Sequence, residues 1–497
     1  MRSARTGVPP SVLELRRVLA EALVRAQLDL TGPVSMLNAF LNELRPTSGL
    51  TAQGARRLWE EFAQAAAPEG HFLELYMHFP YCRSRCLYCF TSSRAAPGQS
   101  ALRRYVENAR EEAVFFAPAF QGRTFRSWSV GGGTPSLLDA AGLRRWLAPV
   151  ARLFSFEDKG LRSVELNPAS TDGEKLAALR SLGFNRLSFG VQTFNAQLLR
   201  AVKRESQDYG MVRRAIRRAR QAGFDYVNAD LLLGLMGEPA SSFLESFRLL
   251  AALRPSTIII SSLILTDAYM RSGGVTREQY LRHASALLPQ AREGLARLAA
   301  ETGYRPVQFG PQNGTWIFRA EEVAKRRFQQ WERSSPDGQW ASSTLGLGEH
   351  SRSHLFGRAI YDRKPRAFAQ AVPLYALSAL SAKEEMAQHI VYSLDHYCRI
   401  DDVKFRRRFG ADVRTRFALE LRALQALGKI REDEAGFAFL PTGSRERILY
   451  GLFFLMDTVE GSPFSGGKPG GALRRRLERE LGSMSLEREA RDAAHQA

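Results

Sequence analysis

The chain has 497 residues, of which 44% are hydrophobic, enough for one large domain with smaller attachments. Its formal net charge is +19, but the arginines are scattered along helical stretches, and no long basic tract is interleaved with aromatic residues as in single-strand nucleic-acid binders. A solvated arginine-rich surface explains this charge, and attraction of an anionic substrate or partner is the second interpretation. Four cysteines exclude a disulfide framework and indicate a reducing compartment.

The N-terminus carries no recognisable signal peptide, because it has no uninterrupted apolar core and no small-residue cleavage site. No uncharged apolar run reaches the roughly 20 residues that a membrane-spanning helix needs. We therefore expect a cytoplasmic protein that binds neither membranes nor nucleic acid.

The first 70 residues have helical periodicity. Two stretches carry it, "SVLELRRVLAEALVRAQLDL" (11–30) and "TAQGARRLWEEFAQAAA" (51–67), and a turn-rich "RPTSG" (45–49) separates them. We predict a helical extension over residues 1–70.

After residue 70, short apolar strands alternate with helical segments such as 100–120 and 136–154. The predicted strands are 72–79, 125–130, 161–167, 184–191, 224–233 and 257–265. Each parallel return requires a crossover helix, so six β–α units in order predict a parallel sheet. We expect an α/β fold with an open, partial (βα)6 barrel over residues 71–275, and a doubly wound sheet is the alternative.

The remaining chain divides into three predicted parts. Residues 276–378 are less regular and are interpreted as a barrel extension that covers the site. Residues 379–459 have the order helix, helix and hairpin ("KIREDEAGFAFLP", 429–441), which is winged-helix-like. Residues 460–497 begin as a Gly-rich linker and predict a flexible basic tail.

Cys82, Cys86 and Cys89 form a C-x3-C-x2-C motif directly after the first predicted strand. Structural zinc requires four closed ligands, and His78 fits an alternating strand position better than a fourth ligand position. Three thiolates on a cubane iron–sulfur cluster leave one iron open to a small molecule. Zinc with an incomplete ligand set and three buried thiols are the weaker alternatives.

Polar residues follow the other predicted strands. The second strand leads into "GGGTPS" (131–136), whose glycines are expected to expose backbone amides and carbonyls to a ligand. Glu165, Gln192, Asn228 and Asp230 lie near the ends of the next three strands. Because the carboxyl ends of successive parallel strands meet at one edge, these residues predict a single site there.

These ordered motifs resemble the radical S-adenosylmethionine (SAM) superfamily. Within it, "LYMHFPYCRSRCLYC", "SVGGGTPSLL", "SVELNP", "GFNRLSFGVQTFN" and "NADLLLGL" are similar to the HemN family, that of oxygen-independent coproporphyrinogen III oxidase. The similarity covers residues 72 to 270 in order and continues weakly through "LGLGEHS". It implies a radical SAM partial barrel with a C-terminal HemN-like module.

The resemblance implies a role for each matching residue. The three cysteines would ligate a [4Fe–4S] cluster, and SAM would bind the open iron through its amino and carboxylate groups. Reductive cleavage of SAM would then give a 5′-deoxyadenosyl radical. A second SAM can lie beside the first in this family. The implied SAM contacts are Tyr76, Gly132, Gly133, Thr134, Glu165, Gln192, Arg204 and Asp230, of which Glu165, Gln192 and Asp230 are also the candidate catalytic residues.

Two departures bear on the activity. Porphyrinogen-oxidising members continue the cysteine motif with Gly-Cys, whereas this chain has Phe90-Thr91, and residues 1–70 lack the Tyr-rich arm of those members. By elimination we expect the class C methyltransferase and cyclopropanase branch, which transfers a methylene group from a second SAM to an sp2 carbon of a natural-product intermediate. Coproporphyrinogen oxidase-like tetrapyrrole chemistry, haem chaperoning and a sensor cluster are the alternatives.

The expected partners are a small-molecule substrate, a one-electron donor such as flavodoxin or ferredoxin and, for the class C branch, a partner methyltransferase; we expect a monomer. Gly346 and Gly348 of "LGLGEHS" would belong to a further loop near the site. His350 and His354 are interpreted as loop histidines, with proton donation at the site as the alternative. Cys398 is expected to be a small buried hydrophobic residue.

Overall fold

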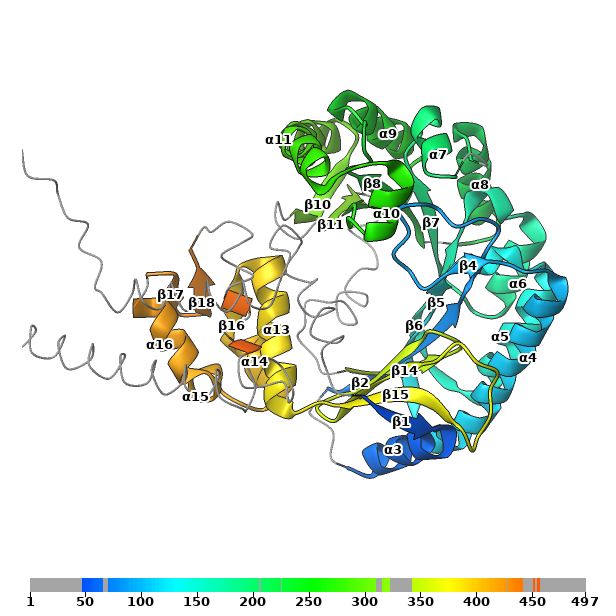
Figure 1. Ribbon diagram of the computed structural model, residues 1–497, viewed down its shortest axis with the longest axis vertical. Helices are drawn as coiled ribbons and strands as arrows, with labels where there is room; N and C mark the ends of the chain where they lie inside the picture. The colour runs from blue at the N-terminus through cyan, green and yellow to red at the C-terminus, as the bar shows by residue number, and fades with distance from the viewer. Residues whose placement is uncertain are drawn as a thin grey trace, which may run out of the picture.

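The computed structural model describes residues 47–65, 70–204, 207–224, 226–309, 315–321, 342–426, 428–440, 450–451 and 454–455. One sheet of 13 strands dominates it, and a small module of helices with a three-stranded sheet follows at the C-terminal end (Figure 1). The predicted helix at 11–30, residues 310–314 and the predicted tail at 460–497 lie outside the described residues.

The centre of the large sheet is parallel, and its strands follow one another in chain order. They are β2 (Phe72–Phe79), β5 (Thr124–Gly132), β6 (Ser155–Leu166), β7 (Arg186–Gln192), β8 (Tyr226–Leu233) and β9 (Thr257–Ser262). A doubly wound sheet would reverse its strand order at a switch point, and across these six strands the order never reverses. The prediction of a partial (βα)6 barrel is confirmed.

The crossover helices lie along the outer side of the curved sheet (Figure 1). They are α4 (Gln99–Phe116), α5 (Ala140–Leu153), α6 (Gly173–Ser181), α7 (Ala196–Ala201), α8 (Tyr209–Gln221) and α9 (Ala240–Ala252). The helix predicted over 100–120 ends at Phe116 and continues as a 3-10 turn, Ala117–Phe120. Pro118 explains this difference, because proline cannot donate the helical backbone hydrogen bond.

The two faces of each strand differ in chemistry. On β2, Leu73, Leu75, Met77 and Phe79 are buried in the main hydrophobic core, whereas the alternate positions carry Glu74, Tyr76 and His78. The same alternation places Ser163 and Glu165 of β6, Ser188 of β7 and Asp230 of β8 on the polar, inward face. Burial of the apolar face drives the sheet and helices together, and each large apolar side chain contributes about 1.5–3 kcal/mol. The polar face is left for the interior of the barrel.

Both edges of the parallel sheet are extended. Beside β2 lie β12 (Ser342–Leu347), β13 (Arg352–Leu355), β14 (Ala359–Arg363), β15 (Pro373–Ala379) and β1 (Ser48–Thr51). Beside β9 lie β11 (Thr315–Ala320) and β10 (Tyr304–Phe309), after α10 (Asp267–Gly273) and α11 (Arg277–Glu301). The region after residue 275, expected to be irregular, therefore supplies a long helix and strands at both edges.

The predicted N-terminal extension is only partly helical where it is described. The helix predicted over 51–67 is present as α3 (Ala52–Gln64), capped by the Thr51 side chain. The turn predicted over 45–49 is wrong for its last two residues, Ser48 and Gly49, because they belong to β1, which pairs with β15. This pairing joins residues more than 300 positions apart, which local sequence patterns do not encode.

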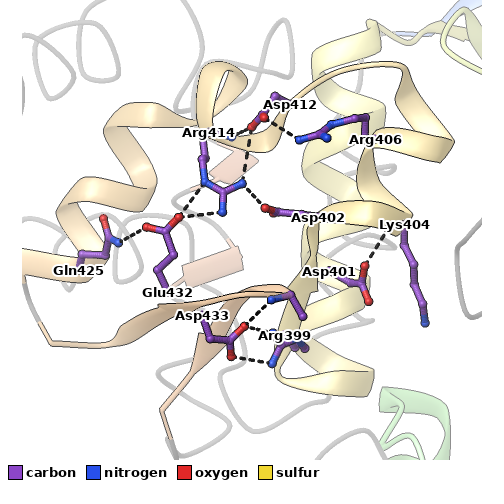
Figure 2. A network of polar contacts seen from close by, with 11 residues as sticks. Arg399, Asp401, Asp402, Lys404, Arg406, Asp412, Arg414, Gln425, Glu432 and Asp433 are labelled. Carbon is purple, nitrogen blue, oxygen red and sulfur yellow. Dashed lines mark hydrogen bonds and ion pairs between the residues drawn. The ribbon is translucent and has the colours of Figure 1, made fainter.

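The C-terminal module follows the predicted order of helices and hairpin. It contains α13 (Ala382–Tyr397), β16 (Arg399–Asp401), α14 (Asp402–Phe409), α15 (Val413–Arg416), α16 (Ala418–Ala426), β17 (Ile430–Asp433) and β18 (Gly436–Phe439), with its own hydrophobic core. It contacts the sheet extension where His354 binds Glu385 at 2.8 Å and Phe356 stacks on Phe409. Figure 2 shows a network of hydrogen bonds and ion pairs among residues of this module.

None of the helices in the described part of the chain is both long and apolar enough to cross a membrane.

Candidate active site

A cavity of about 420 Å³ lies at the carboxyl ends of the parallel strands, within the size range of small-molecule sites. Ten of the eleven predicted site residues line it: Cys82, Cys86, Cys89, Gly132, Gly133, Thr134, Glu165, Gln192, Arg204 and Asp230. Thus residues from five separate segments converge on one place, as the strand-end argument predicts.

The cysteines lie on the loop after β2. A short ladder between β3 (Tyr81–Cys82) and β4 (Arg94–Ala95) closes this loop, and the Cys89 amide donates to the Cys86 carbonyl at 3.1 Å within it. The Leu87 amide also donates to the Val202 carbonyl at 3.2 Å. These backbone bonds hold all three thiols at the cavity wall.

Each thiol has a polar neighbour. Thr134 Oγ1 donates to Cys82 Sγ at 3.3 Å, Thr91 Oγ1 lies 2.9 Å from Cys89 Sγ, and Arg204 Nη1 donates to Cys86 Sγ at 3.6 Å. Hydroxyl and guanidinium donors stabilise a thiolate, the form in which cysteine binds metal. Burial raises the pKa of Cys82 in the metal-free chain, a penalty that metal binding offsets.

No group of three His, Cys, Asp or Glu residues among those the structure describes converges closely enough to hold a single metal ion. A cubane cluster does not need such convergence, because each of its cysteines binds a different iron. Three thiols with hydrogen-bond donors around a shared cavity fit a [4Fe–4S] cluster whose fourth iron is left open.

The glycine turn after β5 is packed against its surroundings. A Cβ atom on Gly131 would lie 2.7 Å from Glu165 Oε2, and one on Gly132 would lie 2.6 Å from the His78 ring. A Cβ on Gly133 would lie 2.5 Å from the Tyr81 carbonyl oxygen. Any side chain here would displace the cysteine loop or the carboxylate, so the three glycines bring these segments together.

The expectation that this turn exposes its amides is wrong. Gly132 N donates to Glu165 Oε2 at 3.2 Å, Gly133 N to the Phe79 carbonyl at 2.6 Å, and Thr134 N to the Tyr81 carbonyl at 2.8 Å. The amides thus fix the turn to neighbouring strands and loops. The cavity is therefore lined by Gly132, Gly133 and Thr134, whose amides are already engaged within the protein.

Glu165 and Asp230 form the acidic wall of the cavity. Burial raises the pKa of Glu165, and the nearby Asp230 carboxylate raises it further, while the Gly132 amide lowers it. Burial also raises the pKa of Asp230, against the opposing effect of hydrogen bonds from Asn228 and Ser188. Two carboxylates at one wall suit a ligand that carries positive charge or several N–H and O–H donors.

Asp230 is held by a buried network. Asn228 Nδ2 donates to Asp230 Oδ1 at 2.6 Å, Ser188 Oγ donates to Asp230 Oδ2 at 3.0 Å, and Thr257 Oγ1 donates to Asn228 Oδ1 at 2.7 Å. Asn228 is therefore a satisfied core residue that positions the carboxylate from behind.

Gln192 and Arg204 lie over Gly190 on the neighbouring wall. A Cβ on Gly190 would lie 2.9 Å from Gln192 Nε2 and 3.2 Å from Arg204 Nη2, and Arg204 donates to the Gly190 carbonyl. Gln192 has a φ of 74°, uncommon for a residue with a side chain, at a bulge between β7 and β8. Burial lowers the pKa of Arg204, but the interactions of its guanidinium with Tyr88 and Cys86 have the larger effect, so the pKa of Arg204 is raised overall.

Tyr76 is the one predicted contact that does not border the cavity. Its hydroxyl lies 2.9 Å from His78 Nδ1 on the inward face of β2. Its pKa is raised, first by burial and then by the Glu165 charge, which places it beside the acidic wall.

The remaining candidates lie outside the cavity lining. His350 lies in a turn, where it contacts Arg94 at 3.4 Å and the His78 ring, so its interpretation as a loop histidine fits the structure. His354 lies in strand β13 and binds Glu385 of the C-terminal module, so the loop interpretation is wrong for this residue. Gly346 pairs with Tyr76 between β12 and β2, and Gly348 packs against the His78 carbonyl and Tyr105.

Cys398 is half-buried against the core of the C-terminal module. Its position agrees with the expected small hydrophobic role.

Three functional neighbours were missed by the sequence analysis. Thr91 and Ser93 contact Cys89, and their hydroxyls within four positions of the last cysteine were the available signal. Arg186 lies near both Glu165 and Asp230, and burial lowers its pKa although these carboxylates oppose the shift. Its inward position follows from the period-two alternation with Ser188 and Gly190.

Comparison with known proteins agrees with this geometry. A family model described as the radical SAM superfamily matches residues 76–250. The oxygen-independent coproporphyrinogen III oxidase of Escherichia coli (strain K12) is 27% identical over 399 residues, which cover 77% of this chain and 86% of that protein. The heme chaperone HemW of Lactococcus lactis is 32% identical over 192 residues, 39% of this chain and 49% of that protein.

The solved structure of coproporphyrinogen III oxidase (HemN) from Escherichia coli superposes with a TM-score of 0.65 at 24% identity. It covers 80% of this chain and 93% of that one. The fold, the matched domain and the cysteine-lined cavity together define a radical SAM enzyme. Within that class the chain is HemN-like, with relatives along most of its length among the coproporphyrinogen III oxidases.

Proposed function

We propose that this enzyme holds a [4Fe–4S] cluster through Cys82, Cys86 and Cys89, binds SAM in the adjoining cavity and acts on a tetrapyrrole of the coproporphyrinogen type. The observation that carries the proposal is the convergence of three thiols, the glycine turn and two carboxylates on one cavity. When bound, the cluster and SAM supply one-electron cleavage of SAM and a 5′-deoxyadenosyl radical that abstracts hydrogen from the substrate.

The protein's own residues bind, orient and exclude water. The glycine turn leaves room above β5, Glu165 and Asp230 offer acceptors to ligand N–H and O–H groups, and Arg204 offers a guanidinium beside Cys86. Enclosure matters because a carbon radical reacts with whatever it meets, so a dry, oriented site restricts it to its target.

The relatives support tetrapyrrole chemistry over the methylene transfer that elimination had favoured. Several coproporphyrinogen III oxidases align with about three quarters of this chain and more than four fifths of their own length. Such coverage extends well beyond the matched radical SAM domain at residues 76–250.

Class C methylene transfer with two SAM molecules is the second candidate, because of Phe90. This side chain is 64% exposed and lines the cavity at the position directly after the third cysteine, where the porphyrinogen-oxidising members have glycine. A large apolar side chain at this wall suits a different substrate surface, which keeps methylation or cyclopropanation of a natural-product intermediate as an alternative.

One anaerobic experiment separates these candidates. The cluster-reconstituted enzyme is incubated with dithionite and methyl-deuterated SAM, with and without coproporphyrinogen III. Unlabelled 5′-deoxyadenosine whose yield rises with coproporphyrinogen, together with loss of CO2, supports the tetrapyrrole function. Deuterium in 5′-deoxyadenosine supports methylene transfer instead, and a reconstituted enzyme that never cleaves SAM contradicts both.

We further propose that an acidic one-electron donor, of the flavodoxin or ferredoxin kind, docks on the exposed basic residues around the cysteine loop. Arg83, Arg85, Arg200 and Lys203 are all exposed there. The two segments that carry them meet where Ser84 Oγ donates to the Lys203 carbonyl at 3.5 Å. Charge complementarity of this kind raises association rates, and such a donor and free thiols fit a cytoplasmic location.

The docking proposal is tested with an Arg85→Glu/Arg200→Glu variant. Flavodoxin-driven SAM cleavage is expected to fall about tenfold while dithionite-driven cleavage stays at the wild-type rate. Arg144→Glu/Arg145→Glu on α5 is the matched control, since it reverses two charges on the outer helices. Equal losses with both reductants, or an equal loss in the control, would contradict this docking surface.

A further inference from the structure

His78 is the point at which three parts of the proposed cofactor site meet. Its ring is almost fully buried, with 5% of the residue exposed. Nδ1 lies 2.9 Å from the Tyr76 hydroxyl, and Nε2 lies 3.1 Å from the carbonyl oxygen of Ser92 on the cysteine loop. The ring also occupies the space beneath Gly132, where a Cβ would come within 2.6 Å of it.

The partners of the ring determine where its proton lies. A carbonyl oxygen only accepts hydrogen bonds, so His78 Nε2 must carry the proton that it donates to Ser92. Burial lowers the pKa of His78, which keeps the ring neutral at pH 7 and leaves Nδ1 without a proton. Nδ1 is therefore an acceptor, and the Tyr76 hydroxyl donates to it.

The direction of the hydrogen bond from Tyr76 to His78 determines how the Tyr76 hydroxyl can bind a ligand. With its only proton directed to His78, the Tyr76 oxygen has lone pairs left and no donor. It lies on the inward face of β2 beside the Glu165 charge. An oxygen restricted to accepting, next to a carboxylate, suits a cationic N–H donor such as the SAM ammonium group.

We propose that His78 is a positioning residue that holds the Tyr76 hydroxyl as a hydrogen-bond acceptor for SAM and locks it in register with the cysteine loop and the glycine turn. The inference rests on the proposed SAM site and goes beyond it, because neither Tyr76 nor His78 is among the residues that line the cavity. Tyr76 adjoins the site through Glu165, which does line it. His78 thus affects SAM through Tyr76 rather than by contact.

A double-mutant cycle on the cluster-reconstituted enzyme tests this assignment. The Kd for SAM is measured by anaerobic equilibrium dialysis without reductant, and iron per chain is measured for each variant. Tyr76→Phe and His78→Leu are each expected to weaken SAM binding about tenfold, and the double variant no more than Tyr76→Phe alone. His78→Asn keeps a polar group near the Nδ1 position and is expected to bind within about threefold of wild type.

The matched control is His283→Leu. His283 also bonds a backbone carbonyl, that of Leu235 at 3.0 Å, but it lies outside the cavity lining, so wild-type SAM affinity is expected. If His78→Leu loses iron, His78→Asn and His78→Gln decide the question. The Gln side chain reaches toward Ser92 rather than Tyr76 and is expected to bind SAM about tenfold more weakly.

Several results would overturn the inference. One is a loss of SAM affinity of about a hundredfold in the double variant, the product of the two single effects. The others are wild-type SAM affinity in His78→Leu and equally weakened SAM binding in His78→Asn and His78→Leu. Failure of the wild-type enzyme to bind SAM at all would instead overturn the proposed function, so the two failures are distinguishable.

Discussion

The barrel cavity and the C-terminal module both carry several charged residues, but the pKa values of their carboxyl groups are shifted in opposite directions. In the cavity, burial raises the pKa values of Glu165 and Asp230. In the module, hydrogen bonds lower the pKa values of two aspartates. The Arg414 backbone amide lowers the pKa of Asp412, and the Arg399 side chain lowers the pKa of Asp433.

The geometry explains this contrast. Arg414 of the module reaches Asp402, Asp412 and Glu432 at once, in contact with solvent (Figure 2). In the cavity, Asp230 is half-buried and held by the neutral donors Asn228 and Ser188, and Glu165 accepts from the Gly132 amide. Charge in the module is neutralised for folding, whereas charge in the cavity is left at an energetic cost for a ligand to use.

The largest expected effect comes from removing a cysteine of the cavity. Cys86→Ala leaves two ligands for the cluster, so iron content falls and 5′-deoxyadenosine formation drops to the level of a blank. Cys398→Ala, the same change on the half-buried cysteine of the C-terminal module, keeps wild-type iron and activity. Iron analysis and chromatography of 5′-deoxyadenosine check both, and retained SAM cleavage in Cys86→Ala would contradict the ligand assignment.

A buried ion pair outside the cavity gives the largest expected loss of stability. Glu112 of α4 accepts from Arg363 at 3.1 Å and Tyr375 at 2.7 Å through Oε1, and from the Gly348 amide at 2.9 Å through Oε2. Glu112→Gln places an NH2 group against one of these donors and leaves Arg363 buried without a counter-charge. The free energy of unfolding is expected to fall by about 3 kcal/mol or more in urea titrations.

Glu107→Gln is the control for this prediction on the same helix. Glu107 pairs with Arg110 at 3.2 Å, but both side chains are nearly half exposed. The expected change is below about 0.5 kcal/mol. Equal effects of the two substitutions would show that Glu112 does not join α4 to the sheet extension.

A pH-dependent effect is expected at Glu238, which is 1% exposed. Thr193 Oγ1 donates to Glu238 Oε1 at 3.0 Å, and burial raises the pKa of Glu238 from 4.5 to about 8. Between pH 4.5 and 8 the folded protein keeps a proton that the unfolded chain has lost, so this group's contribution to stability falls as the pH rises. Glu238→Gln removes this pH-dependent loss of stability, because the Gln side chain does not titrate.

The gain in stability of Glu238→Gln over wild type should therefore grow from pH 5 to pH 8, approaching about 1.4 kcal/mol per pH unit. Urea unfolding at pH 5, 6.5 and 8 measures it. Glu245→Gln on α9 is the control, because its ion pair with Arg248 lowers the pKa of Glu245 and places its titration below this window. Parallel pH profiles for wild type and Glu238→Gln would contradict the prediction.

The sequence predicted the cavity better than its surroundings, for a physical reason. Strand alternation and the order of the β–α units place Glu165, Gln192 and Asp230 at one edge once the sheet is parallel. The amides of the glycine turn were misjudged because their acceptors, the Phe79 and Tyr81 carbonyls, lie about fifty residues earlier in the chain. Non-local partners of this kind have no signature in a local pattern.

The same reason explains the missed strands at the sheet edges. β12 pairs with β2, and β1 pairs with β15, across about 270 and more than 300 residues. Short, half-polar segments become strands there because an existing edge offers unpaired backbone groups, not because their own sequence favours it strongly.

The smallest expected effect is on the exposed network of the C-terminal module. Arg414 is 39% exposed and pairs with Glu432 at 2.7 Å while its guanidinium lies over the Phe437 ring. Arg414→Met keeps most of the packing and removes three ion pairs, yet solvent screening limits the loss to about 1 kcal/mol, which should shrink further in 0.5 M salt. Urea unfolding at low and high salt measures it. A salt-independent loss as large as that of Glu112→Gln would show that this network acts as a buried one, and the contrast between module and cavity would not hold.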